Sequence, residues 1–165
     1  MAASSGASLA ASSAALAYHR LMPESAPPMT RPTLSAHGLR FLQRPAIYAT
    51  IATVGRDGEP HQARTWYRLE GDTIVLNSAV GRRWPTDLLD DPRINVSVAD
   101  GYDWIGIGGI VEPVEDQATA QADIAAMARA YESPDEAAVS IARFRGERRI
   151  SFHVRPLRIH EEFEE

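Results

Sequence analysis

Three segments rich in β-branched residues follow one another with turn signals between them, and this pattern restricts the possible folds most strongly. Residues 46–54 (AIYATIATV) lead into a turn that contains Asp57-Gly58, a strong hairpin signal. Residues 61–69 return as a second strand, and residues 73–77 follow a further turn as a third. The sequence therefore predicts an antiparallel meander of three strands.

The remaining chain predicts three further strands and four helices. The predicted strands span residues 94–98, 104–114 and 149–160, and the predicted helices span 34–43, 84–89, 116–131 and a segment that begins at a capping box, Ser133–Glu136. The apolar phase of the last strand slips at Pro156, which predicts a bulge or bend. Glycines 106, 108 and 109 indicate a bulge, or close approach of another backbone or a flat ligand. Six strands with helices inserted late favour a mostly β fold with helices (α+β), a small antiparallel barrel.

Residues 1–33 consist largely of Ala, Ser, Pro and Met and differ from the rest of the chain. A secretory signal is disfavoured because no Lys or Arg precedes Arg20. Small side chains bury too little apolar area to offset the entropy of ordering. We therefore expect a disordered or extended segment over residues 1–33 and one domain over residues 34–165.

Composition excludes several classes of protein. The chain has no cysteine, which excludes disulfide scaffolds, thiolate metal sites and cysteine nucleophiles, and fits a cytoplasmic protein. All 17 basic residues are arginine, which reflects either anion recognition or codon usage, and the absence of lysine excludes a Schiff base and a P-loop. A net charge of −5 opposes nucleic-acid binding. No apolar run approaches the roughly 18 residues that a membrane-spanning helix needs, so we expect no membrane partner.

The histidines and serines give no pattern typical of a metal or hydrolase site. None of the five histidines is spaced i,i+4 with another, and no G-x-S-x-G sequence is present. We therefore predict no metal ion and no Ser-His-Asp triad.

One segment stands out as a possible anion site, at the end of the third predicted strand. There Asn77 and Ser78 precede a turn of small residues, and Arg82 and Arg83 open a helix. Guanidinium groups, hydroxyl and amide donors and free backbone N–H groups together suit a phosphate. The alternative is that both arginines are merely exposed charges in a turn.

An ordered set of short motifs resembles the pyridoxamine 5′-phosphate oxidase-like split β-barrel superfamily. The set comprises Ala52-Thr53, Asp57-Gly58-Glu59-Pro60, Trp66-Tyr67, Gly71-Asp72-Thr73, Asn77-Ser78, Gly81-Arg82-Arg83, Leu88 and Asp91-Pro92-Arg93. More narrowly, the order is similar to that of flavin- and deazaflavin-dependent oxidoreductases that use coenzyme F420. The resemblance implies a six-stranded, FMN-binding-like split barrel, a homodimer with cofactor sites at its interface, and no acid, base or nucleophile from the protein.

The resemblance also implies which residues bind the cofactor. Asn77, Ser78, Arg82 and Arg83 would contact its phosphate, and residues of two strands would lie along its ring: Thr50, Ile51, Ala52, Thr53, Gln62, Ala63 and Arg64. Trp66 is equally compatible with core packing. Members of the family commonly have lysine after the arginine pair, whereas this chain has Trp84, for which we predict either stacking on a ring or a changed ligand.

These features predict hydride transfer between F420 and a planar, conjugated small molecule. Extra arginines (Arg40, Arg44 and Arg56) favour F420, because its tail carries glutamate. The alternatives are an FMN-dependent oxidase or reductase of the same fold, and a non-catalytic barrel that binds flavin, haem or another flat ligand.

Overall fold

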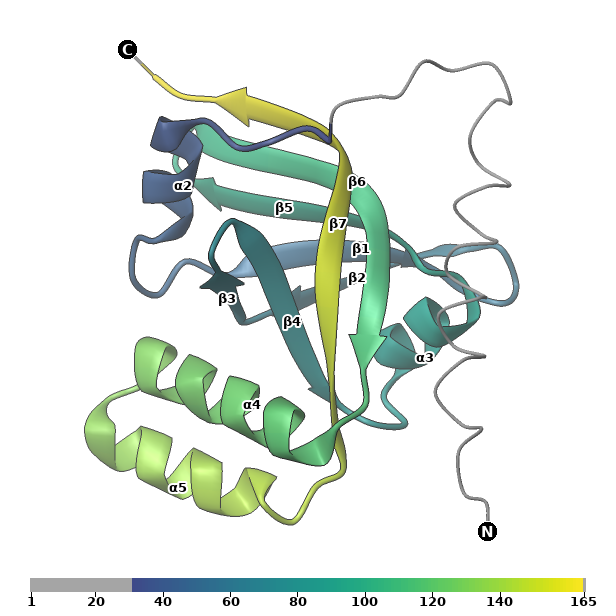
Figure 1. Cartoon of the computed structure of the whole chain (residues 1–165), viewed down its shortest axis with the longest axis vertical. Helices are drawn as coiled ribbons and strands as arrows, with labels where there is room; N and C mark the ends of the chain where they lie inside the picture. The colour runs from purple at the N-terminus through teal and green to yellow at the C-terminus, as the bar shows by residue number, and fades with distance from the viewer. Residues whose placement is uncertain (1–30, 165) are drawn as a thin grey trace, which may run out of the picture. The chain divides into compact units, whose positions relative to one another are not determined.

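Seven antiparallel strands form one curled sheet in residues 31–164, the part of the chain that the computed structural model describes (Figure 1). The strands are β1 (Ala49–Val54), β2 (Pro60–Thr65), β3 (Tyr67–Glu70), β4 (Thr73–Ala79), β5 (Arg93–Asp100), β6 (Asp103–Val114) and β7 (Arg149–Glu162). The helices are α2 (Ala36–Leu42), α3 (Arg83–Asp90), α4 (Gln117–Tyr131) and α5 (Pro134–Phe144). The mostly β, antiparallel architecture is as predicted, whereas the segment expected over residues 1–33 lies outside the described residues except for its last three.

The predicted count of six strands is wrong, because the second predicted strand breaks at Trp66. Residues 60–65 pair with β1, and residues 67–70 pair with β4. The strand order is β2-β1-β5-β6-β7-β4-β3, so β2 and β3 are the two edges of the sheet. The predicted three-strand meander is therefore two separate hairpins. Only Trp66 lies between these two edge strands along the chain. The sheet is therefore curled so that its two edges meet at this residue.

The interior of the curled sheet holds the main hydrophobic core. Alternate residues of each strand point inward, as the period of two requires, and the core includes Ile51, Leu76, Val96, Ile105 and Phe152, each at most 1% exposed. Side chains on the opposite side of β1, β2 and β5 are exposed or half-buried. We call this surface the open face; it comprises Thr50, Ala52, Gln62, Arg64, Asn95 and Ser97.

The bulge predicted at Pro156 is confirmed. The register of β6 against β7 shifts there, since Gly108 pairs with Arg158 and Gly109 pairs with Pro156. Residue 157 therefore has no partner on β6. A Cβ atom at Gly109 would lie 2.2 Å from the carbonyl oxygen of Arg155, so this glycine permits a close approach of two backbones.

The four predicted helices are present and occupy different places around the sheet (Figure 1). The α4–α5 hairpin packs on β4 and β7 through an apolar cluster that includes Val75, Met127 and Phe144. In the predicted capping box, Glu136 accepts hydrogen bonds from the backbone N–H and the hydroxyl of Ser133. No helix within residues 31–164 is long and apolar enough to cross a membrane.

Candidate functional site

The turn from β4 into α3 presents an uncapped helix start with two exposed arginines. Gly81 has φ of +88°, a conformation that favours glycine. Arg82 is the N-cap of α3, and no side chain within residues 31–164 makes a cap hydrogen bond there. The first N–H groups of a helix carry partial positive charge and lack intrahelical partners. Together with the side chains of Arg82 and Arg83, they suit an anion.

Helix α3 is held against the β1–β2 hairpin by polar contacts along one of its faces. The buried carboxylate of Asp87 accepts a hydrogen bond of 3.0 Å from the Thr53 hydroxyl, and Nδ1 of His61 lies 2.9 Å from the same oxygen. Thr53 and His61 therefore meet at one oxygen of Asp87, which ties both strands of the hairpin to α3. Near the ends of the helix, Arg56 pairs with Asp90, and Nη2 of Arg83 lies 4.0 Å from Oδ2 of Asp57.

These contacts bring together two groups of predicted site residues, the arginine pair and the strands β1 and β2. The contribution of Asp87 was not predicted, because a single acidic residue in a short helix gives no sequence signal of its partners. The contact of His61 was not predicted either, because the histidines show no spacing typical of a metal or hydrolase site. In residues 31–164, no group of three His, Cys, Asp or Glu side chains is arranged to hold a metal ion.

The Asn77 side chain is fully engaged inside the protein. Its amide nitrogen donates to the carbonyl oxygen of Ala120 and to the hydroxyl of Ser151, at 2.8 and 2.9 Å. Its oxygen accepts two hydrogen bonds from Arg149, at 3.0 and 2.8 Å. An amide side chain has two donor hydrogens and two acceptor sites. All four are used, so these hydrogen bonds would have to break before Asn77 could contact a phosphate.

Ser78, by contrast, has an unused hydroxyl. The residue is 1% exposed, and its Oγ has no hydrogen-bond partner within residues 31–164. A buried hydroxyl without a partner costs free energy, and such groups in native proteins call for an explanation. Among the residues predicted to contact the phosphate, Ser78 therefore retains a free donor at the end of β4.

Arg149 is a buried cation near the turn that sequence reasoning missed. It is 3% exposed and contacts both Asn77 and the carboxylate of Glu147. Burial lowers the pKa of Arg149, and the ion pair with Glu147 opposes this shift. Arg149 pairs with Ala79 across β4 and β7, so it lies next to the turn that precedes α3. The alternating pattern of β7 gave no signal of this role, because Arg149 stands at the first position of the strand.

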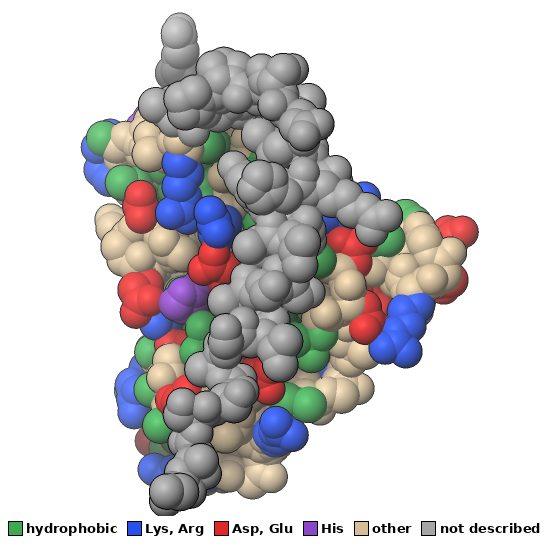
Figure 2. Space-filling model, turned by 45° about the vertical axis from the view of Figure 1, so that its right-hand side comes forward, with side chains coloured by type: hydrophobic (Ala, Val, Ile, Leu, Met, Phe, Trp, Pro, Cys, Tyr) green, Lys and Arg blue, Asp and Glu red, His purple; other side chains and the backbone are tan. Residues whose placement is uncertain are grey.

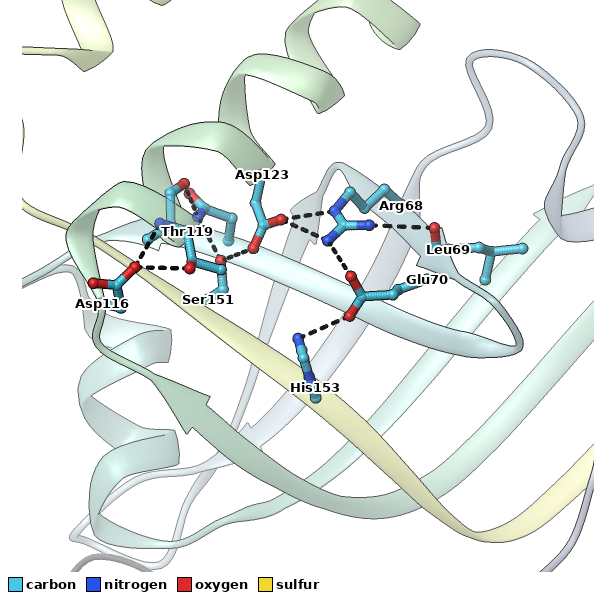
Figure 3. A network of polar contacts seen from close by, with 10 residues as sticks. Arg68, Leu69, Glu70, Asp116, Thr119, Asp123, Ser151 and His153 are labelled. Carbon is cyan, nitrogen blue, oxygen red and sulfur yellow. Dashed lines mark hydrogen bonds and ion pairs between the residues drawn. The ribbon is translucent and has the colours of Figure 1, made fainter. Parts of the chain in front are cut away.

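Arg149 belongs to a chain of buried polar groups between the sheet and α4, part of which Figure 3 shows. Asp123, which is 3% exposed, accepts a hydrogen bond of 2.5 Å from Ser151 and pairs with Arg68 at 2.6 Å. Ser151 in turn accepts from Asn77. The predicted site thus adjoins a network that joins the sheet to the helical hairpin.

The two tryptophans of this region lie in apolar surroundings. The ring of Trp84 is 5.6 Å from that of Phe152 and packs against the core, so stacking on a cofactor stays a prediction. Trp66 stacks on Tyr131 at 5.4 Å and contacts Phe144, which is the core packing considered as its alternative role.

The predicted ring-binding strands present only some of their side chains to the open face. Thr50 lies opposite Arg64, and Ala52 lies opposite Gln62. Ile51 and Thr53 are buried, and Ala63, which pairs with Ile51, packs on the core. Residues on the inner side could contact a ring through backbone atoms alone.

A shallow hollow of 390 Å³ lies at one end of the open face. Its lining includes Tyr48, Thr50, Arg64, Ser97 and Ala99. The guanidinium carbon of Arg64 sits 4.0 Å from the centre of the Tyr48 ring. The volume is within the range of ligand pockets, and the hollow contains two of the residues predicted to lie along the ring.

The charges visible in Figure 2 do not form a patch of one sign. Arginine side chains and acidic side chains alternate over the surface shown. Nucleic-acid binding needs concentrated positive charge, and this surface does not supply it.

Comparisons with known proteins agree with this architecture. The family model described as pyridoxamine 5′-phosphate oxidase matches residues 39–154. No curated protein matches the sequence.

Solved structures share the fold at low identity. A structure named F420 reductase is 23% identical, with a TM-score of 0.58, over 73% of this chain and 94% of its own. A conserved hypothetical protein from Mycobacterium tuberculosis is 19% identical, with a TM-score of 0.62, over 82% and 89%. General stress protein 26 from Bacillus anthracis is 14% identical, with a TM-score of 0.53, over 74% and 88%. At these identities the likeness concerns the fold.

Proposed function

The chain belongs to the pyridoxamine 5′-phosphate oxidase family, and from this premise we propose that it is an oxidoreductase that uses a flavin-type cofactor, coenzyme F420. It transfers a hydride between this cofactor and a planar, conjugated small molecule. The observation that carries the proposal is the start of α3, where an uncapped helix and two exposed arginines adjoin the buried Arg149. A phosphate-bearing cofactor suits this donor set.

The residues present fit the anionic part of such a cofactor. Arg82 and Arg83 supply guanidinium groups, Ser78 supplies a buried hydroxyl without a partner, and α3 supplies backbone N–H groups. Asn77 contributes indirectly, since it holds Arg149 in place. Arg149, whose guanidinium group pairs with Glu147, lies near this turn, where family members commonly have the lysine that Trp84 replaces here.

The cofactor supplies the hydride chemistry when bound, and the protein positions it. The small side chains of Thr50 and Ala52 leave room for a flat ring along β1, next to the hollow that Arg64 lines. The contacts of Asp87 with Thr53 and His61 fix α3 relative to β1 and β2. The distance between phosphate and ring sites is thereby held constant.

One observation favours F420 over FMN: a solved structure of the same fold is named F420 reductase. From the sequence we expect Arg44 and Arg56 to favour F420 by binding the glutamate of its tail. This support is weakened, because the two side chains pair with Asp100 and Asp90. An FMN-dependent enzyme is therefore the second candidate.

We also propose a homodimer that forms through the open face. This face carries small and polar side chains, and the neighbouring strand β6 adds Gly106 and Gly108. Such a surface allows two sheets to approach closely. Sedimentation analysis should give twice the 18.1 kDa mass of the chain, and a monomer would contradict this proposal.

Titration of the purified protein with F420 and with FMN, followed by cofactor fluorescence, tests the proposed function. We expect saturable binding of both, with F420 bound more tightly. Binding of FMN alone would favour the second candidate. The absence of binding by either cofactor would overturn both enzyme proposals.

A further inference from the structure

We infer that a second hollow, next to the first, binds an organic cation that carries a flat aromatic ring. The hollow measures 500 Å³ and is lined by residues of β5, of the β5–β6 turn, of the start of β6 and of the end of β7. Its lining is made up of Ser97, Ala99, Gly101, Tyr102, Trp104, Glu162, Phe163 and Glu164. No residue in this lining belongs to the cofactor site predicted from the sequence.

Three aromatic rings form the walls of this hollow. Tyr102 is 80% exposed, the highest value among the large hydrophobic residues that the structure describes. Trp104 is held in position, because its ring lies over Gly106 and 4.8 Å from the ring of His160. Phe163 is stacked on His37, with ring centres 4.1 Å apart. Aromatic faces attract cations, and flat rings stack on them.

The charges at the hollow are negative. Glu162 and Glu164 line it, and Asp103 lies close by, since it accepts a hydrogen bond of 2.9 Å from the Glu164 backbone. The lining contains no arginine. Arg44 pairs with Asp100, and its Nη1 lies 3.9 Å from Oδ2 of Asp103.

Two histidines adjoin the lining: His37 stacks on Phe163, and Nε2 of His160 lies 3.3 Å from a carboxylate oxygen of Glu162. Aromatic walls together with carboxylates therefore select a ring-bearing cation and repel an anion of the same shape.

The position of the hollow connects it to the proposed reaction. Ser97 and Ala99 line both this hollow and the 390 Å³ hollow that contains Thr50 and Arg64. A cation bound here would lie next to the position proposed for the cofactor ring. The substrate class that follows is a planar, conjugated molecule with an ammonium or amidinium group. This assignment rests on the proposed function, whereas cation binding does not.

Two probes with the same ring and opposite charge test the inference. Tryptamine carries an ammonium group on an indole, and indole-3-propionate carries a carboxylate. Calorimetric titration of the full chain near neutral pH should show tryptamine binding at least tenfold more tightly. Added salt should weaken tryptamine binding, because the attraction is partly between exposed charges.

Variants locate the binding. Tyr102→Ala and Glu164→Gln should each weaken tryptamine binding about threefold, the size expected for an exposed cation–π contact or ion pair. Both side chains are exposed, so the fold is retained. Glu115→Gln removes an exposed carboxylate elsewhere and should leave binding unchanged.

Equal binding of the two probes would overturn the inference, as would full tryptamine binding by both Tyr102→Ala and Glu164→Gln. The cofactor titrations described above are independent of this result. If tryptamine binds as expected and neither cofactor does, the cation site stands and the proposed oxidoreductase function fails. If the cofactors bind and tryptamine does not, the proposed oxidoreductase function stands and the cation site fails.

Discussion

Arg83 and Asn77 are only six residues apart and both belong to the predicted phosphate site, yet their surroundings are opposite. The Arg83 side chain is 67% exposed, and its nearest carboxylate oxygen is 4.0 Å away. Asn77 is 4% exposed and makes four hydrogen bonds within the protein. A substitution at the first position should therefore affect a ligand, and a substitution at the second should affect the fold.

Replacement of Arg83 by alanine should weaken cofactor binding at least tenfold and leave the melting temperature nearly unchanged. The loss of a charge-assisted hydrogen bond costs about 1.5–3 kcal/mol of binding free energy, while an exposed arginine adds little stability. Titration and thermal unfolding of the same sample measure both effects. Arg129→Ala, an exposed arginine on α4, is the control and should bind normally; unchanged affinity in Arg83→Ala would place the phosphate elsewhere.

The substitution Asn77→Ala should destabilise the protein by about 3 kcal/mol, because it removes four buried hydrogen bonds and takes away the acceptor of Nε and Nη2 of Arg149. Chemical denaturation gives this free energy directly. Asn77→Asp, which keeps the acceptor oxygen facing Arg149, should cost less. Should Asn77→Ala unfold at the wild-type denaturant concentration while its cofactor affinity falls, Asn77 would be a ligand residue rather than a structural one.

At the scale of elements, the turns and helix starts carry most of the chemistry. Helix α3 covers one end of the sheet and brings its arginines to the β1–β2 hairpin through Asp87. The bulge in β7 lets that strand follow β6 past Pro156. The position of α3 and the bulge in β7 can therefore each be tested by substituting one residue.

Gly109→Ala should be strongly destabilising, whereas Gly106→Ala should be mild. A Cβ atom at Gly109 would lie 2.2 Å from a backbone oxygen, which cannot move without opening the β6–β7 pairing. At Gly106 the nearest atom belongs to the ring of Trp104, so an added methyl group would displace a side chain and leave the β6–β7 pairing intact. Melting temperatures of the two variants test this order, and equal stability would show that the bulge does not require glycine.

The elements could be predicted from the sequence where the signal is local. Caps, the Asp57-Gly58 hairpin and the phase slip at Pro156 each depend on residues close together in the chain. The break at Trp66 could not be predicted, because it arises from the switch of pairing partner between β1 and β4. Likewise, the partners of Asn77 come from residues 120, 149 and 151, so its burial has no local signature.

On the scale of the whole molecule, the meeting of the two sheet edges at Trp66 is the main structural feature. Tyr131 supports this junction from α4: it stacks on Trp66, accepts a hydrogen bond from the backbone of Tyr67 and donates one of 2.6 Å to the carbonyl oxygen of Ile47. The helical hairpin, the β3 edge and the segment before β1 are thereby joined. The stability of the whole molecule should therefore depend on the side chain of Tyr131.

Stability should fall as the pH rises above about 10. Burial raises the pKa of Tyr131 from 10.0 to about 12, and burial also raises that of Tyr67. Between these values the unfolded chain ionises while the folded protein does not, so unfolding becomes more favourable. Denaturant unfolding at a series of pH values checks the slope. Tyr131→Phe should lower the stability at neutral pH and reduce the slope; a flat profile in the wild type would contradict the burial of these phenols.

The most direct measurement of the central claim is a crystal structure of the protein soaked with F420. We predict that the phosphate lies at the start of α3, in contact with Arg82 and Arg83, and that the ring lies along β1 beside Thr50. A structure in which this corner is empty and both arginine side chains point into solvent would contradict the proposed function and leave only the fold.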